Sequence, residues 1–599
     1  MKFLSKSVPM IAQFYLRNIL LDITMSKFII HRSALLILAG LLLFSGCNSK
    51  TANGPADLVL RNGFIYTVDS LSTKVEAVAI KGSEFIYVGS NSGVEDYIGK
   101  DTKVIDLENK LVLPGFIDSH CHTVSAYKQF YELNLYGLTS VKAIQEQIKK
   151  FRSANPDLKY LKGRGWSNTN FPKTGPDKKI LDEIVRDIPV ALSSEDGHSK
   201  WVNSKTLELA GITRSTKSPA GGVIEHDPIT GEPTGTLREN AADLVADIFS
   251  DYSVTQLIMG LEAYQKMALA FGITTAHDAY LDSWSNEITA YDSLERSNQL
   301  SMRIRASLYV DPEKGLEQIE PLIKERARNK GELFQTPAAK IFVDGVVEGS
   351  TAYLKEPYKH LPNSRGEFLW DMDKLNAMCA ELNKNGFQIH VHSIGDAATA
   401  KTLDAFAYSM DKNGKHDFRN MITHLQLVSP EDIIRFHDLG VVALPQPYWF
   451  TKDQYYYIIQ VPYLGQKRAD EEYPMGSFFK AGVVSASSSD YPVTVPCNPL
   501  IAIQTGITRL LPGVTDSTEI LFPQERVTLE EMIRSFTING AYANFQENVT
   551  GSIEKGKSAD LIVLDKNLFD IPVDQINAAR VLRTIFMGKE VFLFSSESN

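Results

Sequence analysis

Hydrophobic and polar residues form two different sequence patterns along this chain. Between residues 57 and 113, short alternating apolar runs such as Ala77-Val-Ala-Ile are separated by Gly and Asn, as in a small set of β-strands. The run that begins at Val581 near the other end of the chain has the same β-strand pattern. We therefore predict one small β-sandwich domain built from both termini, from residues 57–113 and 546–599.

Residues 114–545 show a second pattern, in which short β-rich runs alternate with longer helical stretches. Two of these runs are Ala339-Lys-Ile-Phe-Val-Asp and Phe387-Gln-Ile-His-Val-His. Strand–helix alternation over this length predicts an α/β fold with a parallel sheet, most commonly closed as a (β/α)₈ TIM barrel. The interval 125–270 is too long for a single β/α unit, so we expect an inserted subdomain there.

An apolar run near the N-terminus has the pattern of an export signal. Residues 33–44 are nearly all apolar and follow basic residues, but the run is shorter than the roughly 20 residues that cross a bilayer. The sequence from Leu43 to Cys47, Leu-Phe-Ser-Gly-Cys, resembles the lipobox of bacterial lipoproteins, whose cysteine becomes a lipidated N-terminus. A membrane-anchor helix with an incidental cysteine remains the alternative.

This pattern predicts where the chain resides. We expect a signal peptide over residues 1–47, lipidation of Cys47 and a polar tether over 48–56. The protein would then be anchored in the bacterial cell envelope, facing the periplasm or the exterior. Whether translation starts at Met1 or at Met25, and which membrane holds the anchor, stay open.

Composition narrows the class of protein. With 599 residues, 43% hydrophobic and 22% charged, the chain is typical of a globular protein rather than a disordered one. A net charge of −10 argues against a nucleic-acid partner held by phosphate contacts. The chain has only 4 cysteines, and with Cys47 lipidated we expect the other three, Cys121, Cys379 and Cys497, to be free.

The sharpest chemical signal is the sequence that runs from Leu111 to His122, Leu-Val-Leu-Pro-Gly-Phe-Ile-Asp-Ser-His-Cys-His. In a strand, His120 and His122 point to the same side while Cys121 points to the other. Imidazole suits Zn²⁺ and related divalent cations. A His-x-His pair alone is a weak motif, because buried or surface histidines without a ligand role are equally common.

The segment from Pro114 to His122 resembles the first-strand motif of the amidohydrolase superfamily. The rest of the chain is similar to its amidohydrolase-3 branch, which contains the YtcJ-like proteins and the N-substituted formamide deformylases. Further matching motifs are Asp196-Gly-His-Ser-Lys-Trp, Gly272-Ile-Thr-Thr-Ala-His-Asp, Lys340-Ile-Phe-Val-Asp-Gly, His392-Ser-Ile-Gly-Asp, Thr423-His-Leu-Gln, Ser489-Asp-Tyr-Pro and Gly551-Ser-Ile-Glu-Lys-Gly. The resemblance extends from about residue 56 to about residue 590.

The resemblance implies a TIM-barrel hydrolase with a metal centre of one or two Zn²⁺ ions. The positions that match its ligands are His120, His122, Lys340, His392, His424 and Asp490. His390 shares the parity of His392 and competes for that role, although the Gly-Asp that follows His392 favours His392.

Lys340 needs separate treatment, because an ammonium group has no lone pair with which to bind a cation. The resemblance suggests that CO₂ carbamylates Lys340, which would turn it into an anionic bridge between two metals. The alternative is that Lys340 pairs with Asp344 or Glu348 and that the site holds a single metal.

The implied activity is hydrolysis of a C–N amide or formamide bond in a small molecule by a metal-activated hydroxide. Asp490 would act as general base and then as general acid, with Lys340 as the other catalytic residue. His198, Trp166 and His277 are the candidate substrate contacts. Each has an ordinary structural alternative, such as a role in a loop or in the core.

Other functions remain open at this point. One is a solute-binding or scaffold lipoprotein that keeps the fold without turnover; the others are a cyclic-amide hydrolase, an N-acyl amino acid hydrolase and a deaminase. The expected partners are a small-molecule amide and a membrane through the lipid anchor, with self-association as a homodimer left open. An aromatic cluster at Tyr455-Tyr-Tyr is either a lid over the pocket or a surface loop.

Overall fold

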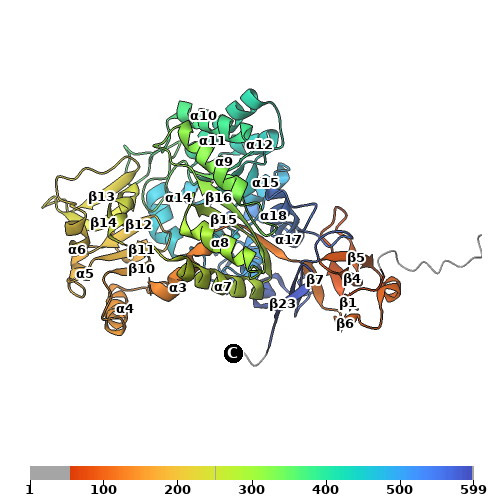
Figure 1. The fold of residues 1–599 in the computed structure, drawn as a ribbon. Coiled ribbons are helices and arrows are strands. Elements are labelled where there is room, and N and C mark those ends of the chain that lie inside the picture. Colours follow the sequence, from red (N-terminus) through yellow and green to blue (C-terminus); the bar gives the residue numbers. More distant parts are fainter. Residues whose placement is uncertain (1–53, 250, 596–599) are drawn as a thin grey trace, which may run out of the picture. The chain divides into compact units, whose positions relative to one another are not determined.

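A seven-stranded parallel sheet forms the centre of the fold in a computed structural model that describes residues 54–249 and 251–595 (Figure 1). The strands neighbour one another in the order β20-β19-β18-β17-β16-β15-β8. In chain order they are β8 (Phe116–Cys121), β15 (Ile273–Leu281), β16 (Arg303–Tyr309), β17 (Phe334–Phe342), β18 (Gln388–Ser393), β19 (Met421–His424) and β20 (Val442–Leu444).

Residues 483–489 close this sheet into a barrel between β20 and β8. On one side Ala443 N donates to Val484 O over 3.0 Å, and on the other Ser119 N donates to Ser487 O over 3.3 Å. The segment does not form a regular strand, because Ser487 N donates to Ser535 O instead of to a neighbouring barrel strand. The predicted TIM barrel is therefore confirmed, with seven regular strands and an irregular eighth segment.

Helices follow the barrel strands in sequence, as β/α alternation requires. They are α7 (Val254–Ala270), α8 (Asn286–Arg296), α9 (Ile319–Arg328), α10 (Met372–Lys384), α11 (Asp396–Asn413) and α12 (Pro430–Leu439). Local sequence fixes where they begin: Ser253 and Gln256 form a capping box on α7, and the Asp371 carboxylate caps α10. Their apolar sides pack with the strands in one continuous hydrophobic core.

A separate six-stranded sheet lies within the interval that the sequence marks as an insertion. Its order is β13-β14-β12-β11-β10-β9. The strands are β9 (Leu133–Asn134), β10 (Leu161–Trp166), β11 (Val190–Ser194), β12 (Ser199–Val202), β13 (Gly222–His226) and β14 (Pro233–Glu239). Helix α4 (Val141–Ala154) contributes Ile144 and Ile148 to a hydrophobic cluster that this part of the chain has for itself.

Two further sheets lie on the opposite side of the barrel from the insertion, one built from N-terminal strands and the other from strands of both ends of the chain (Figure 1). One has the order β5-β4-β1-β6 and the other β23-β22-β21-β7-β2-β3. The strands are β1 (Leu58–Arg61), β2 (Phe64–Tyr66), β3 (Lys74–Val75), β4 (Ala77–Lys81), β5 (Glu84–Gly89), β6 (Lys103–Asp106), β7 (Leu111–Pro114), β21 (Leu561–Leu564), β22 (Val581–Phe586) and β23 (Lys589–Leu593). A shared cluster that includes Leu60, Ile80 and Leu561 fills the space between the sheets. The exact domain boundaries stay predictions.

The predicted signal peptide, the lipidation at Cys47 and most of the tether lie outside the described residues. Within the described part of the chain, none of the helices combines the length and the apolar character that a membrane crossing requires. Cys121, Cys379 and Cys497 are buried and free, as expected.

Candidate metal centre and cavity

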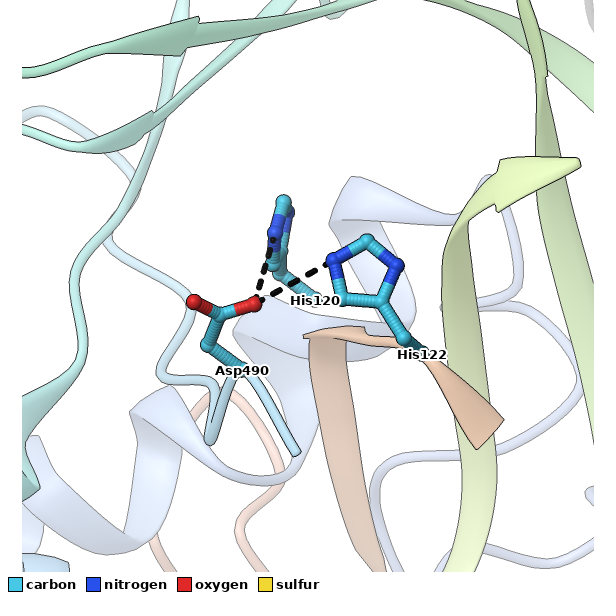
Figure 2. Close-up of side chains that lie close together, drawn as sticks. All are labelled: His120, His122 and Asp490. Carbon is cyan, nitrogen blue, oxygen red and sulfur yellow. Dashed lines mark ion pairs between the residues drawn. The ribbon is translucent and has the colours of Figure 1, made fainter. Parts of the chain in front are cut away.

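Three side chains from the two ends of the barrel sequence meet at its mouth. His120 Nε2 and His122 Nε2 each lie 3.3 Å from Asp490 Oδ1, and Figure 2 shows both rings turned toward that carboxylate. One ligand atom from each residue can be chosen so that all lie within 4.8 Å of one another. His120 Nε2 is buried and forms no hydrogen bond with any described residue. A buried, unpaired ring nitrogen beside a carboxylate fits a divalent cation.

Asp490 has a left-handed backbone conformation, and the buried side chain of Asp118 positions the segment that carries it. Its φ is +56°, a left-handed conformation that costs a non-glycine residue about 1–3 kcal/mol and that concentrates at functional sites. Asp490 N donates to His120 O over 2.8 Å, and Asp118 accepts hydrogen bonds from Ser489 N and Ser489 Oγ. Burial raises the pKa of Asp118 to about 7. Asp118 is thus a positioning residue, and it shares the strand parity of His120.

His424 and His392 line the same mouth. The ring of His424 lies 5.1 Å from that of His120 and 4.5 Å from that of His392. His424 Nδ1 is 3.2 Å from Gln446 Oε1, and His392 Nε2 is 3.3 Å from Gly345 O. These contacts orient the rings and leave one nitrogen of each ring for another ligand. Burial lowers the pKa of His424 to about 3 and that of His392 well below its usual value, so both rings are neutral, the form that binds metal.

Lys340 is buried in β17 beneath these rings. Its ammonium forms no hydrogen bond or ion pair within the described part of the chain, and Nζ lies 4.7 Å from the centre of the Phe342 ring. Burial lowers the pKa of Lys340 to about 7, against the opposing effect of the Asp490 and Asp278 carboxylates. The expected alternative pairing with Asp344 or Glu348 is not observed.

A relay of hydrogen bonds fixes His120 from below. His120 Nδ1 is 2.7 Å from His390 Nε2, His390 Nδ1 is 3.0 Å from Ser307 Oγ, and Ser307 Oγ is 2.7 Å from His277 Nε2. His277 Nδ1 ends the relay 2.7 Å from Asn544 Oδ1. All its side chains are buried.

The direction of the relay follows from its far end. Asn544 Nδ2 donates to Gly540 O, so Asn544 Oδ1 accepts from His277 Nδ1. His277 Nε2 then accepts from Ser307, and His390 donates to Ser307 through Nδ1 and accepts from His120 Nδ1 through Nε2. His120 therefore carries its proton on Nδ1 and presents the Nε2 lone pair to the candidate centre. His390, the competitor of His392 in the sequence, has this positioning role instead.

Replacing His390 by Ala tests the relay. Loss of the acceptor for His120 Nδ1 frees the ring to change tautomer and orientation, so we expect zinc affinity to fall by about 10- to 100-fold. Competition with a chromophoric chelator measures the affinity. The matched control is His437→Ala, which removes an exposed histidine whose ring forms a hydrogen bond with the neighbouring Asp438. Equal zinc affinities of the two variants would contradict the relay.

The structure places two of the predicted substrate contacts in the core, away from the cavity lining. His277 is fully buried within the relay. Trp166 is also fully buried, packs against Phe171 and Trp201, and donates from Nε1 to Leu192 O over 2.8 Å. Neither residue lines the cavity at the barrel mouth. Aromatic and histidine residues that satisfy a core look the same in sequence as those that line a pocket.

His198 does reach the cavity, from the turn between β11 and β12. Its ring lies 5.3 Å from that of His392, and Nδ1 is 2.8 Å from Glu239 Oε2. Although burial opposes the charged form, the charge and the hydrogen bond of Glu239 raise the pKa of His198 to about 10. His198 is thus a cation at neutral pH, paired with Glu239.

The cavity has a volume of about 330 Å³ and begins at His392, His424 and Asp490. The insertion supplies one wall, including His198, and the segment that follows β20 supplies another, including Trp449 and Tyr455. Of the aromatic cluster at 455–457, only Tyr455 lines the cavity. The barrel, the insertion and this segment together enclose space for a small molecule beside the candidate metal centre.

Comparisons with known proteins agree with this picture. The sequence model of the amidohydrolase family matches residues 103–592. Protein LONG AFTER FAR-RED 3 of Arabidopsis thaliana is 31% identical over 544 residues, which cover 90% of this chain and 92% of the relative. YtcJ of Bacillus subtilis is 30% identical over 547 residues, covering 89% of this chain and 99% of the relative.

Two further proteins are similar to the chain. The N-substituted formamide deformylase of Arthrobacter pascens is 26% identical, with 89% of this chain and 97% of that enzyme covered. The crystal structure of an uncharacterized metal-dependent hydrolase from Pyrococcus furiosus superposes with a TM-score of 0.65 at 27% identity, covering 85% of this chain and 99% of that one.

Proposed function

The chain belongs to the amidohydrolase family, and from that membership we propose that it hydrolyses the C–N bond of an amide or formamide in a small molecule. The observation that carries the proposal is the convergence of His120 Nε2 and His122 Nε2 on Asp490 Oδ1 at the cavity. The similarity to an N-substituted formamide deformylase supports the choice of bond.

We propose that His120, His122 and Asp490 hold a divalent cation, with His392 and His424 as ligands on the other side of the mouth. When bound, the cation would polarise the substrate carbonyl and lower the pKa of a water molecule. The residues that fit this role are imidazoles and a carboxylate, a ligand set that zinc accepts.

Asp490 is the proposed proton carrier. Although burial favours the neutral acid, the hydrogen bond from His122 lowers the pKa of Asp490, so its carboxylate is ionised at neutral pH. It can accept the proton of the attacking water and deliver it to the leaving nitrogen as the C–N bond breaks. The amide and water are thereby converted to a carboxylic acid and an amine.

Lys340 is the proposed bridge between two cations once CO₂ has carbamylated it. Carbamylation requires a neutral amine, and a pKa of about 7 supplies one near neutral pH. Burial without a hydrogen-bonded or ion-paired partner leaves the side chain available for this modification.

A substrate panel tests the reaction class. Zinc-loaded protein is mixed with linear formamides, N-acyl amino acids, cyclic ureides and aminopurines, and release of acid or amine is followed. We expect the highest kcat/KM for a linear formamide or simple amide, by about tenfold or more over the cyclic ureides and aminopurines, because the chain is similar over most of its length to an N-substituted formamide deformylase. Turnover confined to aminopurines would instead indicate a deaminase.

A further inference from the structure

The outer walls of the cavity are acidic. Glu195 and Asp196 come from the insertion, Glu348 from the loop after β17, and Asp453 from the segment after β20. No lysine or arginine lines the cavity among the residues that the structure describes. We call these four side chains the acidic wall.

The acidic wall has no basic partner in the described part of the chain, since none of its members forms an ion pair with a lysine or arginine. Asp196 accepts hydrogen bonds from Ser194 Oγ, His198 N and Asn168 Nδ2. Asp453 accepts a hydrogen bond from Tyr456 N. The one cation at the cavity, the His198 imidazolium, is already paired with Glu239. No described lysine or arginine therefore pairs with the acidic wall.

Aromatic faces lie among the acids. Trp449 stacks on His424 with ring centres 5.8 Å apart and planes 14° apart, and Tyr448, Tyr455 and Tyr473 line the same cavity. Aromatic faces attract ammonium and guanidinium groups, most strongly where water is excluded. Trp449 connects this aromatic region to His424 at the candidate centre.

A buried acceptor points independently to a ligand. Gln460 lines the cavity, and its Oε1 is buried with no hydrogen-bond partner among the described residues. A buried carbonyl oxygen without a hydrogen-bond partner is unfavourable, so a ligand that donates a hydrogen bond to it would be stabilised there. An N–H donor on a ligand would satisfy it, whereas a carboxylate would not.

We propose that the cavity selects amides whose other end carries a cationic group, an ammonium or a guanidinium, which the acidic wall, the aromatic faces and Gln460 Oε1 bind. The scissile bond would then lie at the candidate metal centre and the cation toward the outer wall. This substrate class rests on the proposed amide hydrolysis at that centre.

The pKa values of the carboxyl groups in the acidic wall agree with the lack of a nearby cation. Burial and the neighbouring Asp196 carboxylate raise the pKa of Glu348 to about 8. Burial also raises the pKa of Glu195 and of Asp453. A carboxyl group whose pKa is raised in this way is partly protonated at neutral pH, and an incoming ammonium group would favour its ionised form.

Three matched formamides test the proposal on the full, zinc-loaded chain. Each has a formamide on an n-butyl chain, and the chain ends in ammonium, methyl or carboxylate. We expect kcat/KM to fall in that order, by about tenfold or more at each step, because only the ammonium complements the wall. Glu348→Gln and Asp453→Asn should each lower the ratio of kcat/KM for the ammonium and methyl substrates. Asp187→Asn is the control, because it removes a surface carboxylate that pairs with Arg152 away from the cavity.

Calorimetric binding of the same compounds separates this proposal from the proposed function. If none is hydrolysed but the ammonium compound binds about tenfold or more tightly than the methyl one, amide hydrolysis fails and the cation site stands. If the methyl or carboxylate compound is bound and turned over as well as the ammonium compound, the cation site is overturned while hydrolysis stands. Equal effects of Asp187→Asn and Asp453→Asn on the ratio would also overturn it, since they would indicate net charge alone.

Discussion

Replacing Asp490 by Asn is expected to abolish most turnover while leaving the protein folded and metal-bound. The amide cannot take up a proton from water, so we expect kcat to fall by about 10³-fold, within the range for loss of a general acid–base group. His120, His122, His392 and His424 remain to hold the cation, so zinc content should change little. Steady-state kinetics and elemental analysis of the same preparation measure both quantities.

A variant of another carboxylate serves as the control for Asp490→Asn. Asp282→Asn alters an exposed side chain just after β15, outside the cavity, and should retain the activity of the unaltered chain. Thermal unfolding of both variants checks that the fold is intact. Substantial activity in Asp490→Asn would refute the proton-transfer role of Asp490. Loss of zinc together with activity would reduce Asp490 to a ligand.

Replacing Lys340 by Ala is expected to empty one of two cation positions. Without the carbamate bridge, zinc should fall from about two equivalents per chain to about one or fewer, and activity should fall with it. Propionate, a short carboxylic acid that fits the space left by the side chain, should partly restore both zinc and turnover. Elemental analysis and kinetics with and without propionate measure this rescue.

Propionamide, the uncharged analogue of propionate, is the control for the rescue. Propionamide has nearly the same shape but no charge, so it should restore nothing if an anionic bridge is what Lys340 supplies. Unchanged zinc stoichiometry in Lys340→Ala would contradict the carbamate bridge and leave a single-metal site. Equal rescue by propionamide would indicate that the variant lost packing rather than a ligand.

Local patterns in the sequence predicted the barrel and the shared orientation of His120 and His122, whereas the resemblance to the amidohydrolase superfamily implied that the strand ends converge on one site. The parity of His120 and His122 places both at the mouth of a parallel sheet, and Asp490 follows the last apolar run of the barrel. That the closing segment 483–489 is irregular was not foreseen, because it depends on the bond from Ser487 N to Ser535 O, a partner distant in sequence.

The relay and the acidic wall depend on contacts that no local pattern specifies. His390 meets His120 only because β18 and β8 face each other across the barrel, and the residues are 270 positions apart. Strand parity placed His390 on the same side as His392 but could not distinguish a metal ligand from a residue that positions a ligand. Glu348 and Asp453 come from loops, whose conformation is set by packing rather than by hydrophobic period.

The central claim is that this amidohydrolase-family chain performs metal-dependent hydrolysis at His120, His122 and Asp490. The most direct measurement is a zinc titration of chelator-stripped protein while hydrolysis of its best panel substrate is followed. We predict negligible hydrolysis without metal, a rise that tracks bound zinc to saturation, and no such rise in a His120→Asn variant. Hydrolysis that persists unchanged after the metal is removed, or that is absent across the whole panel at full zinc loading, would contradict the claim.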